Sequence, residues 1–256
     1  MLLLQLINSV VIIQEAETLY TIFPEIRMGK AGCGCDHRPL CYYFDREPVC
    51  AHSRRNGYGR GSPKLCEKAH EGQFRKGTKR PYIVHPLEVA KIVSTMTDDE
   101  EIISAALLHD TLEDCRQVTK EQIKEAFGER VLEMVRQESE DKSKTWVERK
   151  STTIRHLKTA PRAVQMIALA DKLSNIRDID REYPKVGEEF WNRFRMKSKA
   201  AMGWYYIGVK DALQEDFAGI PAYEEYKMLV EKIFGSTSDW QRREQNEEDK
   251  DHMFCE

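Results

Sequence analysis

The sequence lacks the basic excess that is typical of chains built to bind nucleic acid. Its 40 lysines and arginines are outnumbered by 43 aspartates and glutamates, and the formal net charge is −3. Binding to DNA or RNA depends on many contacts between cations and phosphates, so we expect no nucleic-acid partner. A small anionic substrate needs only a local basic patch, so the net charge does not exclude this class of ligand.

A long apolar run is also missing. No segment reaches the roughly 18 apolar residues that suggest a membrane span. Residues 1–13 (MLLLQLINSVVII) are apolar, but no basic segment precedes them and no small-residue cleavage site follows. We therefore expect neither a signal peptide nor a membrane partner.

The cysteines do not suggest a disulfide framework. There are seven of them, an odd number, and five lie within residues 33–66. This usage favours a reducing, cytoplasmic compartment. A structural zinc site in the same segment is an alternative, but its Cys-x-Cys spacing differs from the Cys-x₂₋₄-Cys of common zinc fingers. The residues concerned are Cys33, Cys35, His37, Cys41, Cys50 and His52.

The sequence also lacks convincing alternating strands and internal repeats. By periodicity and composition, the chain divides into three regions. Residues 1–62 have little sustained periodicity and predict an atypical, poorly ordered N-terminal extension. Residues 63–235 predict successive helices and therefore an all-α domain. Residues 236–256 are polar and net acidic, which is typical of a disordered tail.

Individual helix signals in the middle region are clear. Pro86 and Pro161 are each expected to begin a helix, because proline is favoured at the first helical position. Residues 102–109 (IISAALLH) are apolar almost all round, which predicts a buried helix. Thr119 and Gln122 predict a capping box. Two further helices are expected over residues 188–214 and 222–234.

Polar side chains interrupt these apolar helices at three places. His109 and Asp110 follow the buried run, Asp171 follows the apolar residues 166–170, and His85 precedes Pro86. Charged side chains are rarely fully buried unless they are paired or bind a metal. Any one of these residues alone could be a helix cap or a salt-bridge partner. Together, two imidazoles and two carboxylates suit Mn²⁺, Fe²⁺, Co²⁺ or Zn²⁺ better than Ca²⁺.

Four segments carry a family resemblance. Residues 69–77 (AHEGQFRKG) lead into residues 81–87 (PYIVHPL), and residues 105–114 (AALLHDTLED) and 169–175 (LADKLSN) follow. Their order and spacing resemble the hydrolase domain of RelA/SpoT-type enzymes, and small single-domain alarmone hydrolases in particular. The resemblance extends over roughly residues 63–235 and implies an HD-domain helical bundle with a single metal site.

The resemblance also implies roles for individual residues. One metal, usually Mn²⁺, would be bound by His85, His109, Asp110 and Asp171. The attacking water would be positioned and activated by Glu113 and Asp114. The substrate would be contacted by Arg75, Lys76 and Asn175. The family removes pyrophosphate from the 3′ position of (p)ppGpp and yields GDP or GTP, and animal relatives also dephosphorylate NADPH.

The chemistry of these residue types agrees with those roles. A divalent metal lowers the pKa of its water and neutralises phosphate charge. Two carboxylates beside that water offer a general base and an orienting partner. Arg75 and Lys76 supply donors for a pyrophosphate group, the arginine with bidentate geometry. Lys142 and Lys144 are further candidates for phosphate contact, with an ordinary exposed loop as the equal alternative.

The sequence departs from the family pattern before residue 67. Residues 52–66 hold several glycines and a proline where the first helix of the family is expected, so this helix is expected to be shortened or replaced. One hypothesis is that residues 1–62 are a non-native extension. No segment after residue 235 is long enough for a synthetase domain, so we expect hydrolysis without synthesis.

Three functions compete at this point. The first is metal-dependent hydrolysis of guanosine 3′,5′-bis(diphosphate) to GDP and pyrophosphate. The second is an HD phosphohydrolase that acts on NADPH or another nucleotide. The third is a metal-bound nucleotide sensor without turnover, which the presence of Glu113 and Asp114 disfavours because a sensor needs no water-activating acids.

Overall fold

The computed structural model describes residues 41–44, 47–50 and 62–235 of the chain. The chain divides into two units, residues 1–60 and residues 61–256. In the first unit, β1 (Cys41–Phe44) and β2 (Glu47–Cys50) pair antiparallel, with Cys41 opposite Cys50. This hairpin was not expected, because the sequence shows no convincing alternation there, but it lies outside residues 63–235, for which the all-α domain was predicted. Its aromatic residues Tyr42 and Tyr43 have high strand propensity.

Three expectations lie largely outside the described residues. These are the poor order of residues 1–62, the disordered tail over residues 236–256, and the alternative zinc site around Cys33, Cys35 and His37. They stay predictions.

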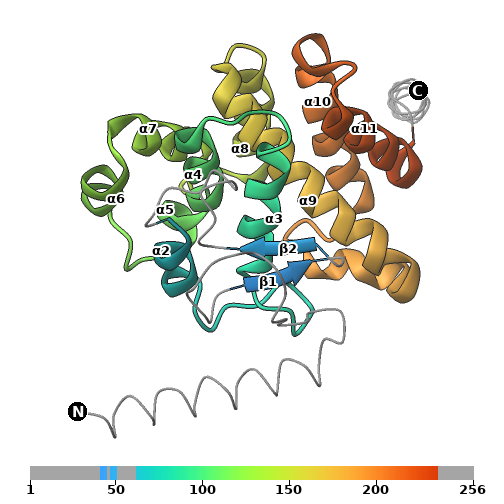
Figure 1. Cartoon of the computed structure of the whole chain (residues 1–256). Coiled ribbons are helices and arrows are strands. Elements are labelled where there is room, and N and C mark those ends of the chain that lie inside the picture. The colour runs from blue at the N-terminus through green and yellow to red at the C-terminus, as the bar shows by residue number, and fades with distance from the viewer. Residues whose placement is uncertain (1–40, 45–46, 51–61, 236–256) are drawn as a thin grey trace, which may run out of the picture. The chain divides into compact units, whose positions relative to one another are not determined.

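The second unit is helical, as predicted for an all-α HD-domain bundle (Figure 1). Across residues 62–235 we find no helix with the length and hydropathy that a membrane span requires. Its elements are α2 (Ser62–Ala69), α3 (Val84–Val93), α4 (Glu100–Leu108), α5 (Thr111–Asp114), α6 (Lys120–Phe127), α7 (Glu129–Glu138), α8 (Trp146–Leu157), α9 (Arg162–Val186), the 3₁₀ helix η1 (Gly187–Arg193), α10 (Lys199–Phe217) and α11 (Pro221–Phe234).

The longest helix, α9, organises the core of this unit. Helices α3, α4, α7, α10 and α11 all pack against it. The first half of α9 is buried nearly all round, as is α4 from Ile102 to Leu108. A helix that is apolar on every side must lie inside a protein. As a consequence, polar residues that interrupt or follow these two helices are carried into the interior.

The helix boundaries mostly agree with the predicted signals. The capping box of Thr119 and Gln122 is present, and Gly128, with φ of 90°, ends α6 and begins α7. Pro161 directly precedes α9. Helix α3 begins at Val84, two residues before the proline that was expected to open it.

The prediction of a single helix over residues 188–214 is wrong. The chain forms η1, leaves helical geometry after Arg193, and starts α10 at Lys199. The Ser198 hydroxyl caps α10 by accepting from the Ala201 amide, and Lys197 adopts a positive φ of 49°. The apolar periodicity continues across this break because both pieces pack on the same core.

Candidate metal centre

Three of the predicted ligands meet in the interior of the helical unit. His85 lies in the first turn of α3, His109 follows the last turn of α4, and Asp171 lies in the middle of α9. One ligand atom from each lies within 4.8 Å of those of the others. The Nε2 atoms of His85 and His109 are 3.1 Å and 3.8 Å from Oδ1 of Asp171. All three residues are buried.

Asp110 joins this cluster from the adjoining turn. Its Oδ2 atom lies 3.1 Å from Nε2 of His109 and 3.5 Å from Nε2 of His85. The Tyr82 hydroxyl donates a hydrogen bond to the same oxygen. The structure thus brings all four predicted ligands together, and their role as ligands stays a prediction.

The two imidazoles have the hydrogen bonds that a metal ligand needs. Nδ1 of His109 lies 2.8 Å from the Ala106 carbonyl oxygen, which can only accept, so Nδ1 carries a proton, and in the neutral imidazole that binds a metal the lone pair lies on Nε2. Nε2 of His109 is buried and makes no hydrogen bond within the described part of the chain. Nδ1 of His85 bonds to the Ser174 hydroxyl at 2.9 Å. Two nitrogen and two oxygen donors that face one point therefore fit a divalent cation.

The electrostatics of the cluster favour anionic oxygen ligands. Burial raises the pKa of Asp110, but the neighbouring His109 outweighs burial and holds the pKa of this carboxyl well below its usual range. Burial also raises the pKa of Asp171, but the charge of Lys172 outweighs burial. The pKa of Asp171 is therefore lowered as well. Burial lowers the pKa of His85. In His109 the charge of Asp110 overcomes burial and raises the pKa to about 9.

The two predicted water-activating acids lie beside the cluster on the short helix α5. Burial raises the pKa of Glu113, the charge of Lys142 lowers it, and the adjacent Asp114 raises it. The Lys142 ammonium lies 3.5 Å from Oε1 of Glu113 and 3.2 Å from Oδ1 of Asp114. It also donates to the Glu113 carbonyl at 2.8 Å. Lys142 therefore contacts both acids and lowers the pKa of Glu113.

One cavity of about 780 Å³ contains the whole arrangement. This size lies within the range of small-molecule sites, about 300–1,000 Å³. Every residue predicted for the site lines it: Arg75, Lys76, His85, His109, Asp110, Glu113, Asp114, Lys142, Asp171 and Asn175.

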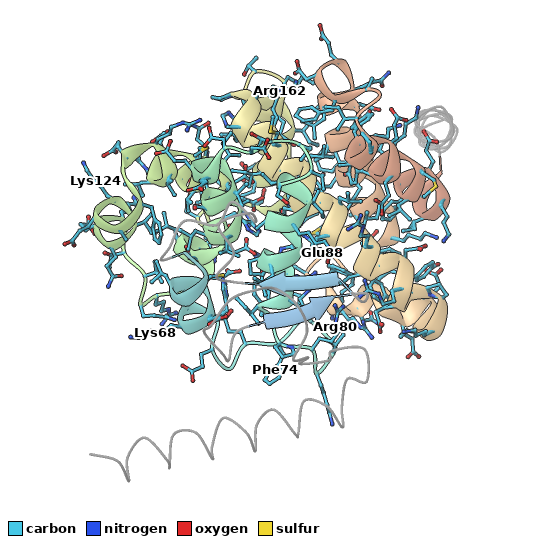
Figure 2. All side chains as sticks on the ribbon, viewed as in Figure 1. Lys68, Phe74, Arg80, Glu88, Lys124 and Arg162 are labelled. Atoms are coloured by element: carbon cyan, nitrogen blue, oxygen red, sulfur yellow. The ribbon has the colours of Figure 1, made fainter. Side chains whose placement is uncertain are left out.

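Arg75 is linked to the metal cluster through α9. Its Nε donates to Oδ2 of Asp178 at 2.9 Å, and its NH2 group donates to Oδ1 of Asn175 at 2.7 Å. Asn175 in turn donates to Oδ1 of Asp171 at 2.6 Å. Arg80, labelled in Figure 2, holds the other oxygen of Asp178 at 2.7 Å. The basic loop before α3 is thereby fixed against the helix that carries Asp171.

Sequence reasoning missed Tyr82, Glu138 and Asp178, which line this cavity, and Ser174, which bonds to His85. Ser174 and Asp178 follow Asp171 by three and seven residues, the spacing of one helical face, so the pattern could have indicated them. Tyr82 and Glu138 had no comparable signal. Glu138 ends α7 and lines the cavity, and burial raises its pKa to about 8.

The comparisons with known proteins agree with this geometry. The model of the HD domain family matches residues 63–193. Over 136 residues the chain is 39% identical to the guanosine-3′,5′-bis(diphosphate) 3′-pyrophosphohydrolase MESH1 of Xenopus tropicalis, a match that covers 52% of this chain and 73% of that protein. The chain belongs to the HD-domain family of RelA/SpoT-type hydrolases. A bacterial relative, the guanosine-3′,5′-bis(diphosphate) 3′-pyrophosphohydrolase of Vibrio cholerae, is 38% identical over 126 residues, 47% of this chain and 18% of that protein.

Two solved structures have a similar fold. The structure of lmo0812 from Listeria monocytogenes EGD-e matches with a TM-score of 0.54 and 33% identity, covering 59% of this chain and 98% of that one. A metazoan ortholog of SpoT, described as hydrolysing ppGpp, matches with a TM-score of 0.56 and 27% identity. That match covers 71% of this chain and 94% of the other. HD hydrolases are metal-dependent, and the His85, His109 and Asp171 cluster could hold a metal ion here.

Proposed function

We propose that this HD-domain hydrolase cleaves guanosine 3′,5′-bis(diphosphate) to GDP and pyrophosphate, with Mn²⁺ as its metal. The observation that carries the proposal is the convergence of His85, His109 and Asp171 beside Glu113 in one cavity. The names of the MESH1 and Vibrio cholerae relatives support the choice of substrate. Water would add to the phosphorus next to the 3′ oxygen, and this oxygen would leave with a proton.

In this proposal, four side chains hold the metal: His85, His109, Asp110 and Asp171. A bound divalent cation lowers the pKa of a coordinated water and neutralises phosphate charge. The mixed nitrogen and oxygen donor set is compatible with manganese, as with Fe²⁺, Co²⁺ or Zn²⁺, and the resemblance to RelA/SpoT-type hydrolases is the reason for choosing manganese. Tyr82 holds one oxygen of Asp110, and Asn175 holds one oxygen of Asp171, so both carboxylates keep a fixed orientation.

Glu113 is proposed as the general base. A base works best when its pKa lies near the working pH, and burial raises the pKa of Glu113 in that direction. Asp114 raises the same pKa through like charge, and Lys142 keeps the two acids in place through its contacts to both. These two acids would orient the attacking water and accept its proton.

The phosphates are proposed to bind at the basic side of the cavity. Lys76 and Lys142 are exposed there and can each turn an ammonium group toward a phosphate. Arg75 is fixed by Asp178 and Asn175, so its remaining donors have a defined direction. Asn175 would contact the ribose. The partner is thus a small nucleotide, and a reducing, cytoplasmic compartment is proposed from the cysteine usage.

The test is Mn²⁺-dependent turnover of ppGpp by the purified protein, with NADPH assayed in parallel. We expect GDP and pyrophosphate from ppGpp, and no product after a chelator has removed the metal. Phosphate release from NADPH without turnover of ppGpp would instead assign the chain to a different HD phosphohydrolase. If neither substrate is turned over while the metal is still bound, the proposal would be overturned in favour of a sensor.

A further inference from the structure

A second carboxylate network lies behind His85, away from the reacting atoms. Glu88, on α3 and labelled in Figure 2, has a side chain that is only 6% exposed. Charged groups are rarely buried without partners. Here Ser174 donates to Oε2 of Glu88 at 3.0 Å, and Arg177 donates to Oε1 at 3.0 Å. Both oxygens of Glu88 are therefore occupied by residues of α9.

The far end of this network is fixed by a third helix. Arg177 donates from Nε and NH2 to the two carboxylate oxygens of Glu225 on α11, each at 2.6 Å. Such a bidentate pair holds the guanidinium in one plane and one direction. Arg177 therefore presents NH1 to Glu88 in a fixed position, and it keeps Oε1 of Glu88 as its acceptor.

The protons in this network can be assigned. As the ion-pair partner of Arg177, Glu88 is a carboxylate, which accepts hydrogen bonds and donates none. Ser174 has a single hydroxyl proton, and this proton goes to Glu88. The Ser174 oxygen is then the acceptor in its 2.9 Å bond with Nδ1 of His85, so Nδ1 must carry a proton. The lone pair of the neutral imidazole consequently lies on Nε2, which faces Asp171.

We propose that Glu88 and Ser174 are positioning residues that hold His85 in the tautomer a metal ligand requires. The other imidazole is fixed differently, because Nδ1 of His109 donates to the backbone carbonyl of Ala106, which side-chain substitution leaves in place. His85 is thus the ligand whose proton depends on side chains. Partners of this kind affect metal affinity about 10- to 100-fold when they are replaced.

The inference rests on the metal site of the proposed function, but not on its substrate. Loss of ppGpp turnover with the tautomer and the metal affinity intact would count against the function alone. An incorrect tautomer would count against this inference whatever the substrate.

The decisive variant is Glu88→Gln, which keeps the shape and removes the charge. Arg177 retains the amide oxygen, so the amide NH₂ faces Ser174 and donates to it. The Ser174 hydroxyl then turns toward His85 and donates to Nδ1, which moves the proton to Nε2. Imidazole ¹⁵N chemical shifts of the metal-free protein report the tautomer, and chelator competition reports Mn²⁺ affinity. We expect a reversed tautomer and Mn²⁺ binding about 10- to 100-fold weaker.

The matched control is Glu225→Gln, the same substitution at the far end of the network. It leaves Glu88, Ser174 and His85 in place, so we expect the wild-type tautomer and Mn²⁺ affinity. If Glu88→Gln fails to fold, Ser174→Ala replaces it and should also weaken Mn²⁺ binding. The inference is overturned if wild-type His85 carries its proton on Nε2. It is also overturned if the replacement near His85 leaves Mn²⁺ affinity unchanged, or if Glu225→Gln weakens it equally.

Discussion

Two walls of the same cavity are built in different ways. The ligand wall consists of His85, His109, Asp110 and Asp171, and both its histidine side chains are 2% exposed. The basic rim consists of Lys76, Lys142 and Lys144, and the side chains of Lys142 and Lys144 are 56% and 51% exposed. Buried, packed groups keep one geometry, whereas exposed lysines exchange among many. The ligand wall should therefore decide whether the reaction occurs, and the rim how well the substrate binds.

The loop that carries part of the rim is fixed at both ends, and Lys142 in its middle contacts the acids of α5. On one side Glu140 is held by Arg149 at the base of α8 and by Lys150 at 2.7 Å. On the other side Thr145 and Glu148 form a capping box that begins α8. Lys142 lies between these anchors. Its ammonium can stay on the acids of α5 or turn to a phosphate without disturbing the helices.

The largest expected effect comes from breaking the ligand wall. Asp171→Ala removes the buried carboxylate that we propose as a metal ligand and leaves two imidazoles without their shared partner. We expect loss of bound metal and of ppGpp turnover together, measured as metal content per chain and as pyrophosphate release. Asp180→Ala is the control, because Asp180 lies on the same helix but pairs with Lys232. A variant at position 171 that still holds one metal per chain would contradict this assignment.

A smaller effect is expected from replacing Glu113 or Asp114, which lie beside the ligand wall and contact Lys142 of the rim. Glu113→Gln keeps the size of the side chain and removes the proposed base, so metal stays bound while kcat falls about 10²–10⁴-fold. Asp114→Asn should follow the same pattern. Single-turnover assays at saturating Mn²⁺ measure this effect directly. Full activity in both variants would show that the mechanism is wrong.

Arg75→Lys tests the link between the two walls. Lysine cannot reproduce the bonds of Nε to Asp178 and of NH2 to Asn175, because it is a point charge without a planar fork. A hydrogen bond to a charged group contributes about 1.5–3 kcal/mol, so kcat/KM should fall about tenfold or more. Metal content should not change. If Arg75→Lys kept the wild-type kcat/KM, the contacts of Arg75 to Asp178 and Asn175 would play no part in the reaction.

The smallest effect is expected at the rim itself. Lys142→Met removes a charge that lowers the pKa of Glu113, so this pKa should rise. The base is active when deprotonated, and the acid limb of the kcat profile should move to higher pH. Because Lys142 is exposed and screened by solvent, the shift should be less than about one pH unit. KM for ppGpp should increase as well.

The control at the rim is Lys144→Met. Its partner is Asp141 at 3.9 Å, so the acid limb should stay in place. An acid limb that moves equally in both variants would exclude a specific effect of Lys142 on Glu113.

The interior position of the ligand wall could be predicted from a local signal, whereas the role of its residues as metal ligands rests on the family resemblance and stays a prediction. Polar residues that interrupt apolar helices must lie inside the domain, and Asp110 and Asp171 do so in the expected way. The spacing of Thr119 and Gln122 likewise predicted a capping box that the structure contains. In each case the physical cause and its sequence pattern fall within one or two helical turns.

What the sequence could not predict depends on tertiary contacts or on local backbone geometry. Glu88 and Ser174 meet because α3 packs on α9, although they are 86 positions apart in the sequence. Tyr82 reaches Asp110 in the same way. The break between η1 and α10 depends on backbone geometry around Lys197 that hydrophobic periodicity does not encode. The hairpin of β1 and β2 lacked the alternation that predicts strands.

The most direct test of the central claim is a joint titration of metal-stripped protein with Mn²⁺. Bound metal per chain and the release of GDP and pyrophosphate from ppGpp are measured in the same samples. The account predicts that product release rises in step with one bound Mn²⁺ per chain, and that neither occurs in Asp171→Ala. Turnover in the metal-stripped protein, or one bound Mn²⁺ without any product, would contradict it.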